Sequence, residues 1–127
     1  MSTTSQEKGF TLLEITVAIA ILSIGLLAVA SMVHMVMNSN RQSSHLTSAI
    51  NLVQGKIDEL RLSDYSTIAD ENEVDLDEDG TAGDGIFDRA VSVTENFTPA
   101  IKIIQVTVRW NDNNPRRVTM RTMIAGP

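Results

Sequence analysis

Two things are missing from this sequence: cysteine and, over one long stretch, charge. Without cysteine the chain forms no disulfide and carries out no thiol chemistry. Many secreted domains of this size are stapled by disulfides, so this fold must be held together in another way. The sequence also has no Ser/His/Asp set, no P-loop and no glycine-rich nucleotide loop, and we therefore do not expect an enzyme.

Charged residues are absent from Ile15 to Asn40, a run of 26 residues. Its most apolar part, Ile15–Met37, contains no proline and, as a helix, is about 35 Å long, enough to cross a bilayer core of about 30 Å. Within it, hydroxyl side chains can bond back to the helix backbone, which makes them tolerable in lipid. These are Thr16, Ser23 and Ser31. A cleaved secretory signal, a plain membrane anchor and a segment cleaved before the apolar run all remain open.

Glu14 stands at the edge of this uncharged run. A carboxylate at the bilayer centre costs roughly 2.5–3.5 kcal/mol, so one near the helix end is unfavourable unless it is paired. For a plain anchor a lysine would serve as well and would match the positive-inside preference. An acidic residue at this position therefore calls for a partner.

The segment that precedes the run reads Lys-Gly-Phe-Thr-Leu-Leu-Glu over residues 8–14. It resembles the processing site of type IV prepilins and type II secretion pseudopilins. The resemblance implies that a prepilin peptidase cuts between Gly9 and Phe10 and methylates the new amine of Phe10, leaving a mature chain of 118 residues. It also implies that Glu14 pairs with the N-terminal amine of a neighbouring pilin during assembly. An ordinary signal anchor with a chance match is the alternative.

Beyond the run, apolar residues recur at spacings of three and four, which predicts one stripe along a helix. The stripe comprises Leu46, Ala49, Ile50, Val53, Ile57 and Leu60, and the polar face carries Gln54, Lys56, Asp58 and Glu59. Phe10 to Leu62 is thus expected to form one helix, on the order of 80 Å long. The expected organisation is a leader peptide at residues 1–9, a transmembrane and assembly helix at 10–40, and a pilin globular domain at 41–127.

The globular domain is expected to be α+β, with the helix packed on a small three-stranded antiparallel sheet. Ser63–Ile68 is predicted to be a loop, and Asp70–Gly85 an acidic, glycine-bearing loop. Alternating apolar and polar residues predict strands at Arg89–Phe97, Ile101–Trp110 and Arg116–Ala125. A turn cluster, Asn111–Pro115, separates the last two strands.

Two departures point away from a major pilin: Ser31 stands near the place where many major pilins have a proline, and a C-terminal disulfide loop is impossible. The segment 49–61 resembles the corresponding helix of PilV-like minor pilins. We therefore expect a minor pilin of a type IV pilus, anchored once in the inner membrane with a periplasmic domain, and then incorporated into the filament or its initiation or tip complex. A minor pseudopilin of a type II secretion system, and a single-pass anchor displaying a calcium-binding adhesion module, are the alternatives.

Charge is unevenly distributed over the polar part of the chain. Residues 58–88 contain twelve acidic residues and one basic residue, a net charge of −11. Four arginines follow near the C-terminus, Arg109, Arg116, Arg117 and Arg121. On a chain of formal net charge −6 they make a weak case for DNA uptake, so nucleic acid is not an expected partner.

The acidic loop contains the pattern D-x-D-x-D-G at residues 75–80, which is typical of the start of a calcium loop. It is not an EF-hand, because the closing glutamate would fall at Ile86. A structural Ca²⁺ outside the cell would be held by Asp75, Asp77, Asp79 and Asp84, with Asp88 as the alternative to Asp84, and it would relieve the repulsion within the loop. A solvated loop without metal is the alternative, and the fold requires no other cofactor.

Overall fold

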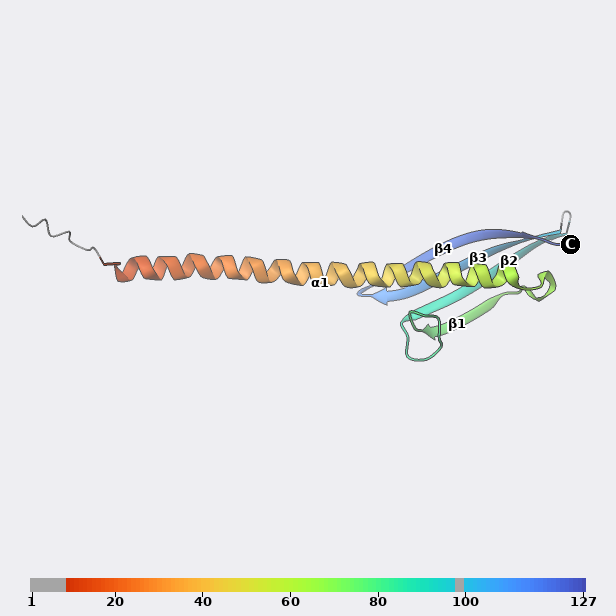
Figure 1. The fold of residues 1–127 in the computed structure, drawn as a ribbon, viewed down its shortest axis with the longest axis horizontal. Coiled ribbons are helices and arrows are strands. Elements are labelled where there is room, and N and C mark those ends of the chain that lie inside the picture. The colour runs from red at the N-terminus through yellow and green to blue at the C-terminus, as the bar shows by residue number, and fades with distance from the viewer. Residues whose placement is uncertain (1–8, 98–99) are drawn as a thin grey trace, which may run out of the picture. The chain divides into compact units, whose positions relative to one another are not determined.

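The computed structural model describes residues 9–97 and 100–127, and the chain divides into two compact units, Met1–Asn40 and Arg41–Pro127. The helix α1 (Leu12–Leu62) contributes to both units (Figure 1). The predicted helix from Phe10 to Leu62 is confirmed with a start two residues later. Of the predicted leader peptide, residues 1–8 lie outside the described part of the chain.

In the first unit, α1 is regular because no proline interrupts it and its hydroxyl groups are satisfied within the helix. Thr16 Oγ1, Ser23 Oγ and Ser31 Oγ donate to the carbonyl four residues earlier at 2.8, 2.8 and 2.9 Å. The sequence-based expectation for these three side chains is thereby confirmed. Every described residue from Gly9 to Asn40 is exposed, so this segment of helix has no core of its own.

The second unit contains a four-stranded antiparallel sheet in the order β1-β2-β3-β4 (Figure 1). A short 3₁₀ helix, η1 (Tyr65–Thr67), follows α1 and leads into the sheet. The strands are β1 (Glu71–Leu76), β2 (Phe87–Phe97), β3 (Ala100–Asp112) and β4 (Asn114–Ala125). The α+β class and the three predicted strands are confirmed. The sheet has one strand more than predicted, β1.

The core lies between one face of α1 and one face of this sheet. From the helix it takes Ala49, Leu52, Val53, Ile57 and Leu60, and from the sheet Leu76, Phe87, Val91, Ile104, Val106, Val108 and Trp110. The predicted stripe is confirmed for the most part. It was wrong at Leu46, which is 43% exposed, and it omitted Leu52, which is 4% exposed.

Strand β1 lies where the sequence predicted only a loop, and its burial pattern explains the error. Glu71 and Glu73 pair in register with Val91 and Arg89 of β2, so these acidic residues lie on the same side of the sheet as core residues. Leu76 is the only buried residue of the strand. Because charged residues occupy its inner face, β1 lacks the apolar–polar alternation by which strands are recognised.

The turn between β3 and β4 is tighter than the predicted cluster Asn111–Pro115. The two strands pair as far as Asp112 and Asn114, so the chain reverses at Asn113. Asn113 has a φ of 62°, in the left-handed region that asparagine tolerates better than most residues.

Candidate functional site

The predicted processing site lies at the start of α1. Gly9, Phe10 and Thr11 precede the helix, and the helix begins at Leu12. The backbone N–H of Glu14 donates to Thr11 Oγ1 at 3.2 Å, so Thr11 caps the N-terminus of the helix. The proposed scissile bond between Gly9 and Phe10 is therefore in exposed, non-helical chain next to a defined helix start.

Phe10, which precedes the helix, and Glu14 in its first turn line the same groove. Together with Ile15, Ala18, Ile19 and Leu22 they line a shallow apolar groove of about 460 Å³. Glu14 is the acidic residue of the first helical turn, where the partial positive charge of the helix N-terminus stabilises a carboxylate. The structure thus brings together the two residues that sequence reasoning assigned to methylation and assembly. The capping role of Thr11 was missed, although the spacing Thr-x-x-Glu is a recognisable capping signal.

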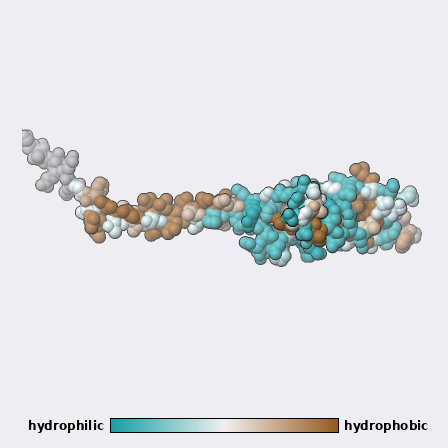
Figure 2. Space-filling view, turned by 90° about the horizontal axis from the view of Figure 1, so that it is seen from below, coloured by the Kyte–Doolittle hydropathy of each residue, from teal (hydrophilic) through white to brown (hydrophobic). Residues whose placement is uncertain are grey.

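The helix that follows has an apolar surface all round. Its residues are exposed as far as Asn40, and no Asp, Glu, Lys or Arg occurs between Ile15 and Asn40. Figure 2 shows this surface as mainly apolar on the face drawn, with less hydrophobic residues between the apolar ones. An exposed apolar surface of this length requires lipid or other helices around it.

Comparison with known families gives one match, a model described as a prokaryotic N-terminal methylation motif, at residues 4–30. The chain carries the methylation motif of type IV pilin-like proteins. The matched segment includes Gly9, Phe10, Glu14 and the first half of the apolar helix. No curated protein and no solved structure matches the chain.

This match supports a pilin-like protein anchored in a membrane by its N-terminal helix. It covers about a fifth of the chain, so it applies to the processing and membrane segment. The match does not extend to the globular unit, residues 41–127, so this unit is described from its structure alone.

The acidic loop between β1 and β2 is closed by its own backbone. The Asp75 carbonyl accepts hydrogen bonds from the N–H groups of Gly83 and Gly85 at 2.9 and 3.2 Å, and the Asp77 N–H donates to the Thr81 carbonyl at 2.9 Å. A Cβ atom on Gly85 would overlap the backbone carbonyl of Leu76, so only glycine fits there. The loop is thus shaped by hydrogen bonds and a required glycine.

The four predicted calcium ligands are only partly brought together. Asp77 and Asp84 line one small cleft of about 240 Å³, whereas Asp75 and Asp79 are not among its lining residues. Over residues 9–97 and 100–127, no group of three or more acidic, histidine or cysteine side chains is placed to hold a metal ion. Calcium binding stays a prediction, and it requires the loop to rearrange.

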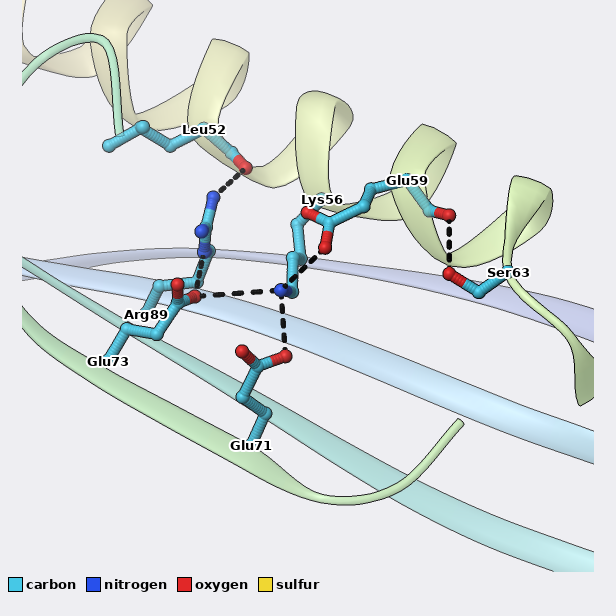
Figure 3. A network of polar contacts seen from close by, with 7 residues as sticks. All are labelled: Leu52, Lys56, Glu59, Ser63, Glu71, Glu73 and Arg89. Carbon is cyan, nitrogen blue, oxygen red and sulfur yellow. Dashed lines mark hydrogen bonds and ion pairs between the residues drawn. The ribbon is translucent and has the colours of Figure 1, made fainter. Parts of the chain in front are cut away.

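A buried ionic network joins α1 to β1 and β2, and the sequence did not reveal it (Figure 3). Lys56, assigned to the polar face, is only 3% exposed. Its Nζ lies 2.7 Å from a carboxylate oxygen of Glu71, 3.2 Å from Glu59 and 3.9 Å from Glu73. The polar-face assignment of Lys56 was therefore wrong, because its side chain is buried and two acidic residues outside the helix, Glu71 and Glu73, supply opposite charge.

Arg89 completes this network from β2. Its Nε donates to Glu73 Oε2 at 2.6 Å, and its Nη1 donates to the Leu52 carbonyl at 3.3 Å. The hydrogen bond from Arg89 holds the pKa of Glu73 below its ordinary value of 4.5, against the opposing effect of partial burial. Burial lowers the pKa of Lys56, but its contacts with Glu71 and Glu59 and the charge of Glu73 outweigh that effect and raise it above 10.5. Lys56 and Glu73 are thus both charged at neutral pH.

A second buried lysine, Lys102 of β3, binds the segment that connects α1 to β1. Its Nζ donates to the carbonyls of Tyr65 and Ile68 at 2.8 and 2.9 Å and lies 4.6 Å from the centre of the Tyr65 ring. It therefore fixes the connection that leaves α1.

At the β3–β4 turn, buried Asp112 accepts a hydrogen bond from Arg41 at 3.0 Å and so ties the turn back to the helix.

Proposed function

We propose that this chain is a subunit of a type IV pilus-like filament, synthesised with a leader, cut between Gly9 and Phe10 by a prepilin peptidase and methylated on Phe10. The methylation motif carries this proposal, with the exposed, uncharged helix that directly follows it. Glu14 then serves assembly, because a carboxylate and a neighbour's terminal ammonium are each costly in lipid and compensate when they meet. The partners are the peptidase and other pilins, reached through the N-terminal helix.

We assign the chain to the minor pilins rather than the major ones. The helix α1 runs without a proline break from Leu12 to Leu62, and the domain has no disulfide. In this role the chain is held in the inner membrane by one span, with residues 41–127 in the periplasm, and then enters the filament or its initiation complex. A minor pseudopilin is the second candidate, supported by the same motif. Filaments isolated from producing cells distinguish the two, since antibody against residues 41–127 would label surface pili only in the first case.

The first test is the N-terminus of the protein from its native membrane, read by mass spectrometry. The expected chain begins at Phe10 and carries one additional methyl group. Gly9→Leu should retain the leader, because a bulky residue replaces the glycine at the cut. Gly25→Leu is the matched control: within this chain a Cβ atom at this position meets no atom within 4 Å, and processing should be unchanged. A native chain that begins at Ser2, or that is cut after Ser31, would refute the proposal.

We also propose, separately, that the acidic loop binds calcium. Its support is the D-x-D-x-D-G pattern and the cleft that Asp77 and Asp84 share. A fragment of residues 41–127 should then melt higher in millimolar calcium than in chelator, with a smaller effect of magnesium. Asp77→Asn with Asp79→Asn should abolish the difference. Equal melting in calcium and chelator would remove all four aspartates as ligands.

A further inference from the structure

Strand β4 forms one edge of the sheet, and in the part of the chain that the structure describes no strand lies beyond it (Figure 1). It is 12 residues long, longer than most strands, and its outer edge presents backbone N–H and C=O groups that β3 does not use. Apart from the ladder with β3, no backbone hydrogen bond to a β4 residue is found in the described ranges of the chain. Such an edge can receive an additional strand.

Two clefts flank this edge. One, of about 610 Å³, lies at the start of β4, where Trp110, Arg116 and Arg117 are among its lining residues. The other, of about 510 Å³, lies between α1 and the later part of β4; Ile57 and Met120 are its apolar lining residues, and the rest are polar or charged, Gln54, Asp58, Arg61, Arg121 and Thr122. The inward side chains of β4 are only partly buried, so α1 leaves this border of the core incompletely covered.

The charged residues of β4 itself are all basic, while each of the two clefts also contains one acidic residue, Asp88 in the first and Asp58 in the second. Arg117 and Arg121 face outward on β4, and Arg109 is the cross-strand neighbour of Arg117. Arg121 donates to the Gln105 side chain at 2.9 Å and Arg116 to the Gln42 side chain at 3.0 Å, both neutral partners. Within residues 9–97 and 100–127, none of these four arginines forms an ion pair.

We propose that the β4 edge is a docking strand for an extended acidic segment of another protein. The segment pairs with the β4 backbone, places acidic side chains beside Arg117 and Arg121, and places the alternate, apolar side chains over Met120 and the cleft beside Ile57. Side chains of a strand alternate between the two faces, so the recognised pattern is acidic–apolar alternation.

A second copy of this chain does not fit the edge. Another β4 would bring arginines against arginines, which is unfavourable. The opposite edge, β1, has acidic residues, but Glu71 and Glu73 are turned toward Lys56 and Arg89 of their own molecule. The partner is therefore a different polypeptide, and the site depends on the unit Arg41–Pro127 alone.

The test uses the full chain in detergent and a capped octapeptide in which Glu and Val alternate. Trp110 is the only tryptophan and lines the cleft beside Arg116, so its fluorescence reports on peptide at this edge. The Glu–Val peptide should change the emission saturably. A Lys–Val peptide, and a Glu–Val peptide methylated on every backbone nitrogen, should not, because one lacks the charge and the other the hydrogen bonds.

Variants locate the effect. Arg117→Gln with Arg121→Gln should raise the Kd for the Glu–Val peptide about tenfold, as expected for losing two exposed ion pairs. Arg117→Lys with Arg121→Lys keeps the charge and should stay within about threefold. Asn72→Glu adds negative charge on the exposed face of the far edge strand and should change the Kd less than about twofold.

Absence of binding by the Glu–Val peptide would overturn the proposal, and so would equal binding of the Lys–Val or methylated peptide. Circular dichroism checks that each variant is folded. Comparison of the double Arg→Lys variant with the double Arg→Gln variant shows that the change in Kd follows the charge at these two positions. The outcome is independent of processing at Gly9 and of filament assembly.

Discussion

Removing the buried ammonium of Lys56 should destabilise the globular unit substantially. In Lys56→Ala, Glu71 loses an ion pair at 2.7 Å, Glu59 one at 3.2 Å, and the aliphatic stem of the lysine is lost from the border of the core. Removing one partner of a fully buried pair costs about 3–5 kcal/mol. Here the side chains of Glu59 and Glu71 are 60% and 44% exposed, so water can replace much of what they lose.

We therefore expect a loss of about 2–3 kcal/mol in the free energy of unfolding. For a domain of this size that corresponds to a fall in Tm of roughly 8–24 °C. Lys56→Met keeps most of the apolar stem but not the charge, and it should cost about half as much. Glu73 keeps its hydrogen bond from Arg89 in both variants, which limits the damage.

The measurement is thermal unfolding of a fragment of residues 41–127 followed by circular dichroism, since this unit contains every buried residue of the described chain. Asn51→Ala, an exposed change on the same helix, is the control and should stay within about 0.5 kcal/mol of the parent. If Lys56→Ala melts as the control does, the ionic network does not stabilise the fold and the reasoning is wrong.

Three further predictions follow from the same structure. Because the pKa of Glu73 is lowered on folding, its contribution is present above pH 4.5 and is lost as the pH falls through the lower folded value; Glu73→Gln should therefore flatten the acid limb of a stability–pH curve measured by urea unfolding. Because the pKa of Lys56 is raised, its contribution is complete below pH 10.5 and is lost at higher pH, so Lys56→Met should flatten the alkaline limb. Glu14→Ala should insert and be processed but enter filaments poorly, and equal amounts of mutant and parent in sheared pili would disprove its pairing role.

The sequence predicted correctly those elements whose signals lie within one continuous segment of the chain. The helix α1 and the strands β2, β3 and β4 follow from periodicity in the chain itself, and their bounds differ from expectation by two residues or fewer. The processing site is equally local, since Gly9, Phe10 and Glu14 are read from one short segment. These elements could be found without any knowledge of what packs against them.

The ionic part of the structure could not be found in this way. Lys56 resembles a surface lysine until the acidic residues of β1 are brought over it, and β1 resembles a loop until Lys56 and Arg89 are brought beneath it. Each half makes sense only with the other, across at least 15 residues of chain. The same holds for Lys102, whose acceptors are backbone carbonyls that carry no signal in the sequence.

The composition of β1 also sets the order in which the domain opens. This strand has one buried apolar side chain, Leu76, and is otherwise held by its ladder to β2 and by ion pairs. Elements with few apolar contacts exchange their amide hydrogens through local opening, at a free energy below that of global unfolding. The β1 amides should therefore exchange before those of β3, whose apolar residues form the centre of the core. Detachment of β1 would expose two buried cations, Lys56 and Arg89, to water and leave most of the apolar core assembled. This edge of the sheet can therefore open while the rest of the domain stays folded.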